Sequence, residues 1–175
     1  MQNERLKSSL LKTIEAIQHD PRNAQAEFNV STALAQGVSA RARTRQFTIA
    51  IDEPEGLGGT DLAPNPVEYV LAALGACQEI VYAAYAAVRG IPLDAVSVEV
   101  KGPIDLHGLF GLKEGVAPGF REITYHTVIE SPADREDIEA LIATVERHCP
   151  VLDTLVNPVK VSGSVEIRST VPSSN

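Results

Sequence analysis

Hydrophobic positions along the chain follow two different periods, and together they predict an α+β fold. Apolar residues recur at steps of three and four in residues 3–19, 66–89 and 131–148, which predicts three helices. Strand-like alternation or composition marks five further segments, at residues 26–35, 39–52, 93–104, 121–130 and 158–168. The order of these elements favours an antiparallel sheet that wraps around helices.

The helix predicted at Pro66–Arg89 is the longest element and is rich in alanine. Pro66 is a favoured first residue of a helix, and Gly90 is a favoured residue just beyond one. The Gly/Pro-rich loop before it, residues 53–66, lacks the spacing of a phosphate-binding loop. Because one sheet cannot cover both sides of so long an apolar helix, the pattern favours a dimer.

The same pattern divides the chain into one domain with two appendages. We expect residues 1–22 to form an N-terminal helical extension, residues 23–170 a single domain, and residues 171–175 a disordered tail. A chain of 175 residues is long enough for one domain with a substantial core.

Composition and charge disfavour several classes of partner. The net charge is −8 at pH 7, so neither nucleic acid nor an anionic membrane surface is an expected partner. The N-terminus lacks the continuous apolar segment of a secretory signal. The apolar run at residues 69–88 contains Gln78 and Glu79, which predicts a buried helix and not a membrane span. The expected location is the cytoplasm.

The chain has two cysteines, Cys77 and Cys149, and neither belongs to a CxxC pair or a histidine cluster. A zinc site is therefore disfavoured. In a reducing compartment the two thiols are either buried packing residues or a working redox pair.

Sequence position alone gives the two cysteines different roles. Cys77 lies mid-way along the long helix among apolar neighbours, where a thiol is inert and serves packing. Cys149 follows His148 at the end of a predicted helix, before an extended segment, and the helix dipole disfavours a thiolate there. Cys149 therefore suits a resolving cysteine better than a primary nucleophile, and His148 is expected to be a solvated surface residue.

A reactive thiolate needs a cation nearby, and three arginines are candidates. Arg41, Arg43 and Arg45 continue the alternation of the apolar residues at 47, 49 and 51, so at least one is expected to face the interior or an interface. The simpler interpretation leaves all three solvated beyond the edge of the core. A guanidinium suits the task because it offers several fixed donors and keeps its charge.

Three stretches of the sequence go together: NPVEYVLAALGAC (65–77), RGI after the long helix, and HCPVLDTLVNPVKV (148–161). In this order they resemble the OsmC/Ohr family of osmotically inducible and organic-hydroperoxide-resistance proteins. The resemblance spans about residues 26–168 and leaves the N-terminal helix outside.

The resemblance implies an intertwined homodimer in which curved antiparallel sheets wrap long central helices, with the active sites at the dimer interface. It also implies a thiol peroxidase that reduces organic hydroperoxides without a cofactor and is recycled by a dithiol reductant. By position, Cys77 matches the peroxidatic cysteine, which becomes a sulfenic acid, and Cys149 matches the cysteine that resolves it. This implication reverses the packing interpretation of Cys77.

The sequence departs from the family at one position. Well-known members carry a glutamate directly after the Asn-Pro pair, but here this position is Val67, and Glu68 follows it. In a regular helix Glu68 lies about 180° around from Cys77, and the glutamate two residues after the cysteine is also off its face. The arginine that such members hold at the thiolate corresponds by position to Arg41, with Arg43 as the fallback.

Two other functions stay open. A non-catalytic protein of the same fold would bind a small hydrophobic ligand at the dimer interface, and Val67 favours this interpretation. A purely structural partner of another protein is favoured only by the N-terminal helix. Sulfurs close enough to bridge in a cleft favour the peroxidase, whereas a buried Cys77 far from Cys149 favours ligand binding.

The site itself is expected to be apolar, which favours alkyl or fatty-acyl peroxides over hydrogen peroxide. The expected lining residues are Leu74, Ile80, Val81 and Phe110.

Overall fold

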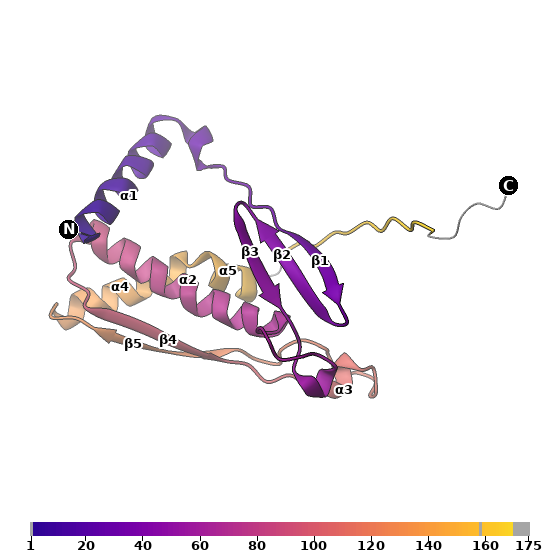
Figure 1. Ribbon diagram of the computed structural model, residues 1–175. Coiled ribbons are helices and arrows are strands. Elements are labelled where there is room, and N and C mark those ends of the chain that lie inside the picture. Colours follow the sequence, from indigo (N-terminus) through magenta and orange to yellow (C-terminus); the bar gives the residue numbers. More distant parts are fainter. Residues whose placement is uncertain (1, 158, 170–175) are drawn as a thin grey trace.

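The computed structural model describes residues 2–157 and 159–169, in which helices and antiparallel strands surround one long helix (Figure 1). The helices are α1 (Gln2–His19), α2 (Pro66–Arg89), α3 (Leu106–Leu109), α4 (Arg135–His148) and α5 (Pro150–Val156). The strands are β1 (Ser31–Gln36), β2 (Ser39–Thr44), β3 (Phe47–Ile51), β4 (Ala95–Lys101) and β5 (Thr124–Glu130), and short 3₁₀ turns lie at Pro21–Ala24 and Glu55–Leu57. The predicted α+β class is confirmed. The tail expected at 171–175 lies outside the described residues.

α2 is the central element, and its sequence accounts for both of its ends. Asn65 accepts a hydrogen bond from the Glu68 N–H at 2.9 Å, and the Glu68 carboxylate accepts one from the Asn65 N–H at 2.8 Å. This reciprocal pair is a capping box, and Pro66 follows it at the first helical position. Gly90 ends the helix with a φ of 74°, a left-handed conformation that favours glycine.

One face of α2 forms the core of the molecule. Its buried residues recur every fourth position, at Leu74, Gln78, Tyr82 and Ala86. Tyr82 and Ala86 pack against α4, whose Leu141 and Val145 are at most 1% exposed. On the other side of the molecule α1 packs against α2, so the predicted N-terminal helix is tied to the domain.

β4 and β5 form an antiparallel pair that packs along α2 (Figure 1). Val100 of β4 lies opposite Tyr125 of β5. Gly75 permits the close approach of helix and strand, because a Cβ at that position would lie 3.3 Å from Val100 Cγ2. Tyr125 is thereby placed next to the middle of α2.

β1, β2 and β3 form a second antiparallel sheet beside the N-terminal end of α2 (Figure 1). The Tyr69 hydroxyl donates a hydrogen bond of 2.6 Å to the Ala50 carbonyl and so joins helix and sheet. The single strand predicted at residues 39–52 is wrong. The chain turns back at Arg45, whose φ is 50°, and β2 and β3 pair as a hairpin.

The same turn overturns the predicted parity of the arginines. β2 and β3 pair with Ala42 opposite Ile49 and with Arg41 opposite Ala50. Directly opposed residues share one face of an antiparallel sheet, so Arg41 lies on the other face from Ile49. The prediction assumed one continuous strand, and the reversal at Arg45 breaks its alternation.

Two predictions for the C-terminal region are also wrong. The segment after Cys149, expected to be extended, begins with the helix α5. The closing strand expected at 158–168 is not formed, because residues 159–169 belong to no helix or strand (Figure 1). Val165 and Ile167 are 90% and 91% exposed. A strand needs a neighbouring sheet edge, and this segment pairs with no strand of the described chain. Pro158 lies outside the described residues.

Asp52 holds the loop that leads into α2. Its Oδ2 atom accepts hydrogen bonds from the Thr60 hydroxyl at 2.6 Å, the Thr60 N–H at 3.1 Å and the Leu62 N–H at 3.2 Å. The Thr60 hydroxyl, followed by the backbone N–H groups of Glu53 and Leu62, lowers the pKa of Asp52 to about 2. The carboxylate therefore stabilises the loop in its ionised form.

This pKa predicts an acid-sensitive loop. Because the folded pKa of about 2 lies below the ordinary 3.8, the stabilisation is fully present above about pH 4 and is lost as the pH falls towards 2. We expect the difference in unfolding free energy between the wild type and Asp52→Asn to shrink across this window. Urea unfolding at a series of pH values measures it, and a difference that stays constant across the window would contradict the role of the carboxylate.

A candidate active site at the cysteine pair

The two cysteines meet where α2 packs against the junction of α4 and α5. Cys77, mid-way along α2, is half-buried, and Cys149, between α4 and α5, is fully buried. Both are free thiols, and their side chains are within hydrogen-bonding reach of each other. Thiols in contact need only small side-chain movements to form a disulfide. The fold therefore makes one site of two residues that are far apart in the sequence.

The burial of the pair corrects the expectation from sequence position. Cys77 was expected to be a core packing residue, but it is the accessible member of the pair. Cys149 has an exposed fraction of 0% and is the packed one. The difference arises because α5, which the sequence analysis did not predict, covers Cys149.

Cys149 ends α4 and also begins α5, so its surroundings act on its pKa in both directions. Burial raises the pKa of the thiol most, and Cys77 adds to the rise. The backbone N–H groups of Leu152 and Val151, in the first turn of α5, oppose it. The pKa is raised on balance, so Cys149 is a neutral thiol near pH 7. Its predicted setting, a helix C-terminus alone, was therefore incomplete.

Three polar side chains that the sequence analysis did not connect to the site lie around Cys149. Tyr125 interacts with the Glu146 carboxylate, and the Gln78 amide approaches its hydroxyl. Burial raises the pKa of Tyr125, and the charges of Glu146 and Cys149 add to the rise. Gln78 is 1% exposed, and neither of its polar side-chain atoms makes a hydrogen bond of good geometry among the described residues. The sequence did contain one signal, a glutamine within an apolar helix.

The carboxylates of α2 are engaged away from the cysteines, as the helical geometry predicted. Glu68 is held in the capping box at the start of the helix. It lies nine residues, or about 13 Å along the axis, before Cys77. Glu79 accepts a hydrogen bond of 3.2 Å from the Val98 N–H of β4. Neither takes the place that Val67 leaves in the family pattern.

The single chain does not bring the candidate arginines to the cysteines. Arg41 and Arg43 are exposed on β2, where they and β1 line a hollow of about 420 Å³. Within residues 2–157 and 159–169, no hydrogen bond or ion pair engages either guanidinium. Arg45 lies in the turn, with its guanidinium 5.0 Å from the centre of the Phe47 ring.

His148 lies next to Cys149 in the chain but points elsewhere. Its ring stacks on that of Tyr85, with 5.6 Å between the ring centroids. The residue is exposed. The expectation of a surface histidine is confirmed.

An apolar hollow of about 380 Å³ opens about one helical turn from the pair, and neither cysteine lines it. Its lining is mostly aliphatic and aromatic, with Leu74, Phe120, Ile123, Tyr125, Leu152, Leu155 and Val156 next to Arg121 and Glu122. Leu74 precedes Cys77 by one helical turn, and Leu152 is the residue whose N–H faces the Cys149 sulfur. Of the four lining residues expected from the sequence, Leu74 is confirmed and the other three do not line this hollow.

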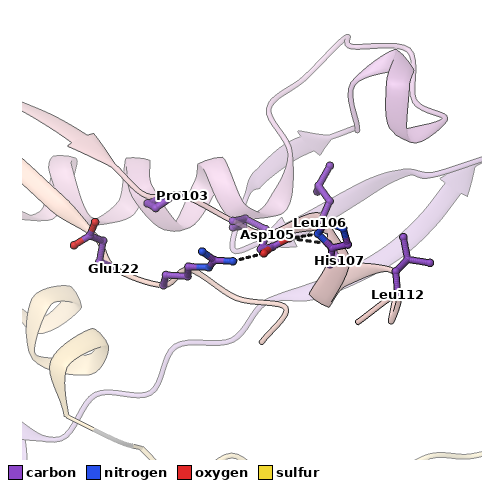
Figure 2. A pocket seen from close by; sticks show the side chains of 8 residues that line it. Pro103, Asp105, Leu106, His107, Leu112 and Glu122 are labelled. Atoms are coloured by element: carbon purple, nitrogen blue, oxygen red, sulfur yellow. Dashed lines mark hydrogen bonds and ion pairs between the residues drawn. The ribbon is translucent and has the colours of Figure 1, made fainter. Parts of the chain in front are cut away.

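A larger hollow, of about 530 Å³, contains neither cysteine (Figure 2). Asp105 lies between His107 and Arg121 there, with its Oδ1 atom 2.8 Å from His107 Nδ1 and its Oδ2 atom paired with Arg121. Arg121 and Glu122 line both hollows. Because Asp105, His107 and Arg121 are engaged with one another, we assign the chemistry of the molecule to the cysteine pair.

Two further features limit the chemistry of the site. Within the part of the chain that the structure describes, no three His, Cys, Asp or Glu side chains are grouped so as to hold a metal ion. α2 is long and apolar enough to cross a bilayer by length and composition, but it packs against β4 and α4 as a core helix does.

Known proteins are similar to this chain in both sequence and fold. A family model described as OsmC-like protein matches residues 58–163. A hydroperoxide reductase from Mycoplasma genitalium is 30% identical over 134 residues, which cover 74% of this chain and 86% of that protein. The crystal structure of an OsmC-like protein from Mycoplasma pneumoniae aligns with a TM-score of 0.65 at 24% identity, over 77% of this chain and 90% of that one. An organic hydroperoxide resistance protein OsmC from Legionella pneumophila gives 0.55 at 23% identity, over 75% and 91%.

Proposed function

The chain belongs to the OsmC-like protein family, and from this premise we propose that it is a cysteine-dependent peroxidase that reduces organic hydroperoxides. The observation that carries the proposal is the contact between half-buried Cys77 and buried Cys149. The similarity to a hydroperoxide reductase supports the same class of reaction. A ligand-binding protein without chemistry would need no such contact, so the pair does not favour that alternative.

In the first step, the Cys77 thiolate attacks the distal oxygen of the hydroperoxide. The O–O bond breaks, Cys77 becomes a sulfenic acid, and the alkoxide takes up a proton and leaves as an alcohol. Cys77 suits this role because it is the accessible thiol of the pair. The apolar hollow beside it suits an alkyl or fatty-acyl chain.

In the second step, Cys149 attacks the sulfenic sulfur of Cys77. The S–S bond forms as the S–O bond breaks, and the hydroxyl group leaves with the thiol proton as water. A dithiol reductant then returns both cysteines to the thiol form by exchange. The contact between the side chains means that this step needs no large movement of the backbone.

Counting free thiols tests this proposal directly. Treatment with one equivalent of cumene hydroperoxide is expected to remove both thiols together, and a dithiol reductant is expected to restore both. A maleimide mass tag on the quenched, denatured protein reports the count, and protein kept without peroxide is the control. Two thiols that stay free after peroxide treatment would rule out the peroxidase and return the search to a bound ligand.

We further propose that the protein acts in the cytoplasm as a homodimer and that each site is completed across the interface. Three observations support a partner subunit. Ile80 on α2 is 68% exposed, although it lies on an apolar helix. Residues 159–168 alternate like a strand but form no ladder with any strand of the described chain. The guanidinium groups on β2 also make no hydrogen bond or ion pair within the described chain. We therefore assign Arg41 of the partner subunit as the cation at the Cys77 thiolate.

This assignment predicts complementation between subunits. Arg41→Ala is expected to lower kcat/KM for cumene hydroperoxide on the order of 10²-fold, because the thiolate and the leaving oxygen lose a fixed donor. A purified heterodimer of one Arg41→Ala and one Cys77→Ser subunit is expected to regain one working site. Arg45→Ala, in the turn beside Phe47, is the matched control and should stay near wild type. A heterodimer without recovered activity would place the arginine in the same subunit as its cysteine or remove it from the site.

A further inference from the structure

A buried thiol that acts as a nucleophile needs a route for its proton. Cys149 is 0% exposed, and burial holds its pKa above the ordinary value, so it enters the second step as a neutral thiol. Its S–H proton must leave as the disulfide forms. His148, its neighbour in the chain, stacks on Tyr85 and is turned away from this task.

Tyr125 is close to both Cys149 and the exposed carboxylate of Glu146. It lines the same hollow as Leu152, whose N–H faces the Cys149 sulfur, and Cys149 is among the groups that act on its hydroxyl. The hydroxyl also interacts with the carboxylate of Glu146, an exposed residue of α4. A tyrosine hydroxyl both accepts and donates a hydrogen bond, so it can take a proton on one side and release one on the other.

Gln78 gives the second, independent observation. Its amide is almost completely buried and approaches the Tyr125 hydroxyl, yet neither its nitrogen nor its oxygen makes a hydrogen bond of good geometry within the described chain. Burying an unpaired amide is costly, so an apolar side chain would make a more stable core. A glutamine here is explained if its amide orients the tyrosine hydroxyl or holds the oxygen that leaves during the reaction.

We infer that Tyr125 and Glu146 form a proton relay for Cys149, with Gln78 as a positioning residue for the tyrosine hydroxyl. This inference rests on the proposed peroxidase function and concerns its second step. As the Cys149 sulfur bonds to the Cys77 sulfur, the thiol proton passes to the Tyr125 oxygen, directly or across one water, while the tyrosine proton passes to Glu146. The departing hydroxide takes one proton from solvent and leaves as water, and Glu146 returns the relayed proton to solvent. The net proton count therefore balances, and no further oxidant or reductant is needed.

Tyr82 is the nearest competing group, and its position makes it less suited. Its hydroxyl is also close to Glu146 and Tyr125, but burial, with Glu146 and Tyr125, raises its pKa to about 12. The residue is 3% exposed and belongs to the core with Leu141. Of the two tyrosines, Tyr125 is the one whose pKa Cys149 raises.

The test separates the two half-reactions in the full-length protein. Wild type, Tyr125→Phe, Glu146→Gln and the double variant are each mixed with one equivalent of cumene hydroperoxide and quenched over time. Dimedone traps the Cys77 sulfenic acid, a maleimide tag counts thiols, and intact mass reports both. We expect disulfide formation to slow about 100-fold in each single variant, with the sulfenic acid accumulating. Because the two residues act in one relay, the double variant should be no slower than Tyr125→Phe.

The controls keep the outcomes distinct. Tyr85→Phe removes a tyrosine hydroxyl from the same region, outside the relay, and should form the disulfide at the wild-type rate. Wild-type protein whose thiols ignore the peroxide would overturn the proposed function and the relay with it. If the wild type forms the disulfide and the folded variants form it equally fast, the relay alone is overturned and the proposed function stands. If Tyr125→Phe does not fold, Glu146→Gln on the exposed face of α4 decides the question.

Discussion

Replacing Cys77 by serine is expected to abolish turnover of organic hydroperoxides and leave the fold intact. A serine hydroxyl stays protonated at neutral pH and lacks the nucleophilicity of a thiolate, so attack on the peroxide oxygen stops. The loss in kcat/KM should be on the order of 10³-fold or more. The stability should change little, because the side chain is half-buried and serine is close to it in size. Consumption of cumene hydroperoxide with a dithiol reductant measures the activity, and thermal unfolding measures the fold.

A serine at a neighbouring position provides the matched control. Ala76→Ser adds the same hydroxyl to an exposed site on the same helix turn and should keep wild-type activity. Substantial activity in a folded Cys77→Ser variant would sink the assignment of the nucleophile. The contact with Cys149 would then mean packing only, and the apolar hollow would become the feature to explain.

The parts of the fold that the sequence predicted well are those with local signals at their ends. α2 was placed residue for residue, because Asn65, Pro66 and Gly90 mark its limits. The helix α5 was missed although Pro150 stands at its first position, where proline favours a helix start. That signal was available and was outweighed by the expectation that the chain continues as an extended segment.

The hairpin at Arg45 had no such signal. Two-residue hairpin turns favour Asn, Asp or Gly, which adopt positive φ at low cost. The turn here uses Arg45 and Gln46, with a φ of 50° at the arginine. The cation–π contact with Phe47 is one interaction that favours this turn, and it depends on the folded hairpin. The alternating strand pattern on the two sides of the turn was therefore interpreted as one continuous strand.

The candidate site, like the fold, was predictable from the sequence only in part. Sequence motifs identified Cys77 and Cys149, but their contact depends on how α2 packs on α4 and α5, which no local pattern encodes. Tyr125, Glu146 and Gln78 come from a strand and two helices, and each is unremarkable in its own segment. Their grouping is a property of tertiary packing, so only the structure could show it.

Replacing Cys149 by serine is expected to separate the two half-reactions. Cys77 should still react with the first equivalent of cumene hydroperoxide, but its sulfenic acid should persist because no thiol lies beside it. Turnover with a dithiol reductant should fall on the order of 10²-fold, since the reductant must now reach a half-buried sulfur directly. A second equivalent of peroxide should then convert the sulfenic acid to a sulfinic acid, which the dithiol does not reverse.

Intact mass after each equivalent distinguishes the products, and the wild type, which closes its disulfide, should resist the second oxidation. This contrast follows from the geometry: contact with Cys149 removes the sulfenic acid before another peroxide arrives. Wild-type turnover in Cys149→Ser would show that the reductant resolves Cys77 alone, and Cys149 would lose its role while Cys77 kept its own. The relay of Tyr125 and Glu146 would then have no thiol proton to carry. This single variant therefore decides whether the second half of the site has a function.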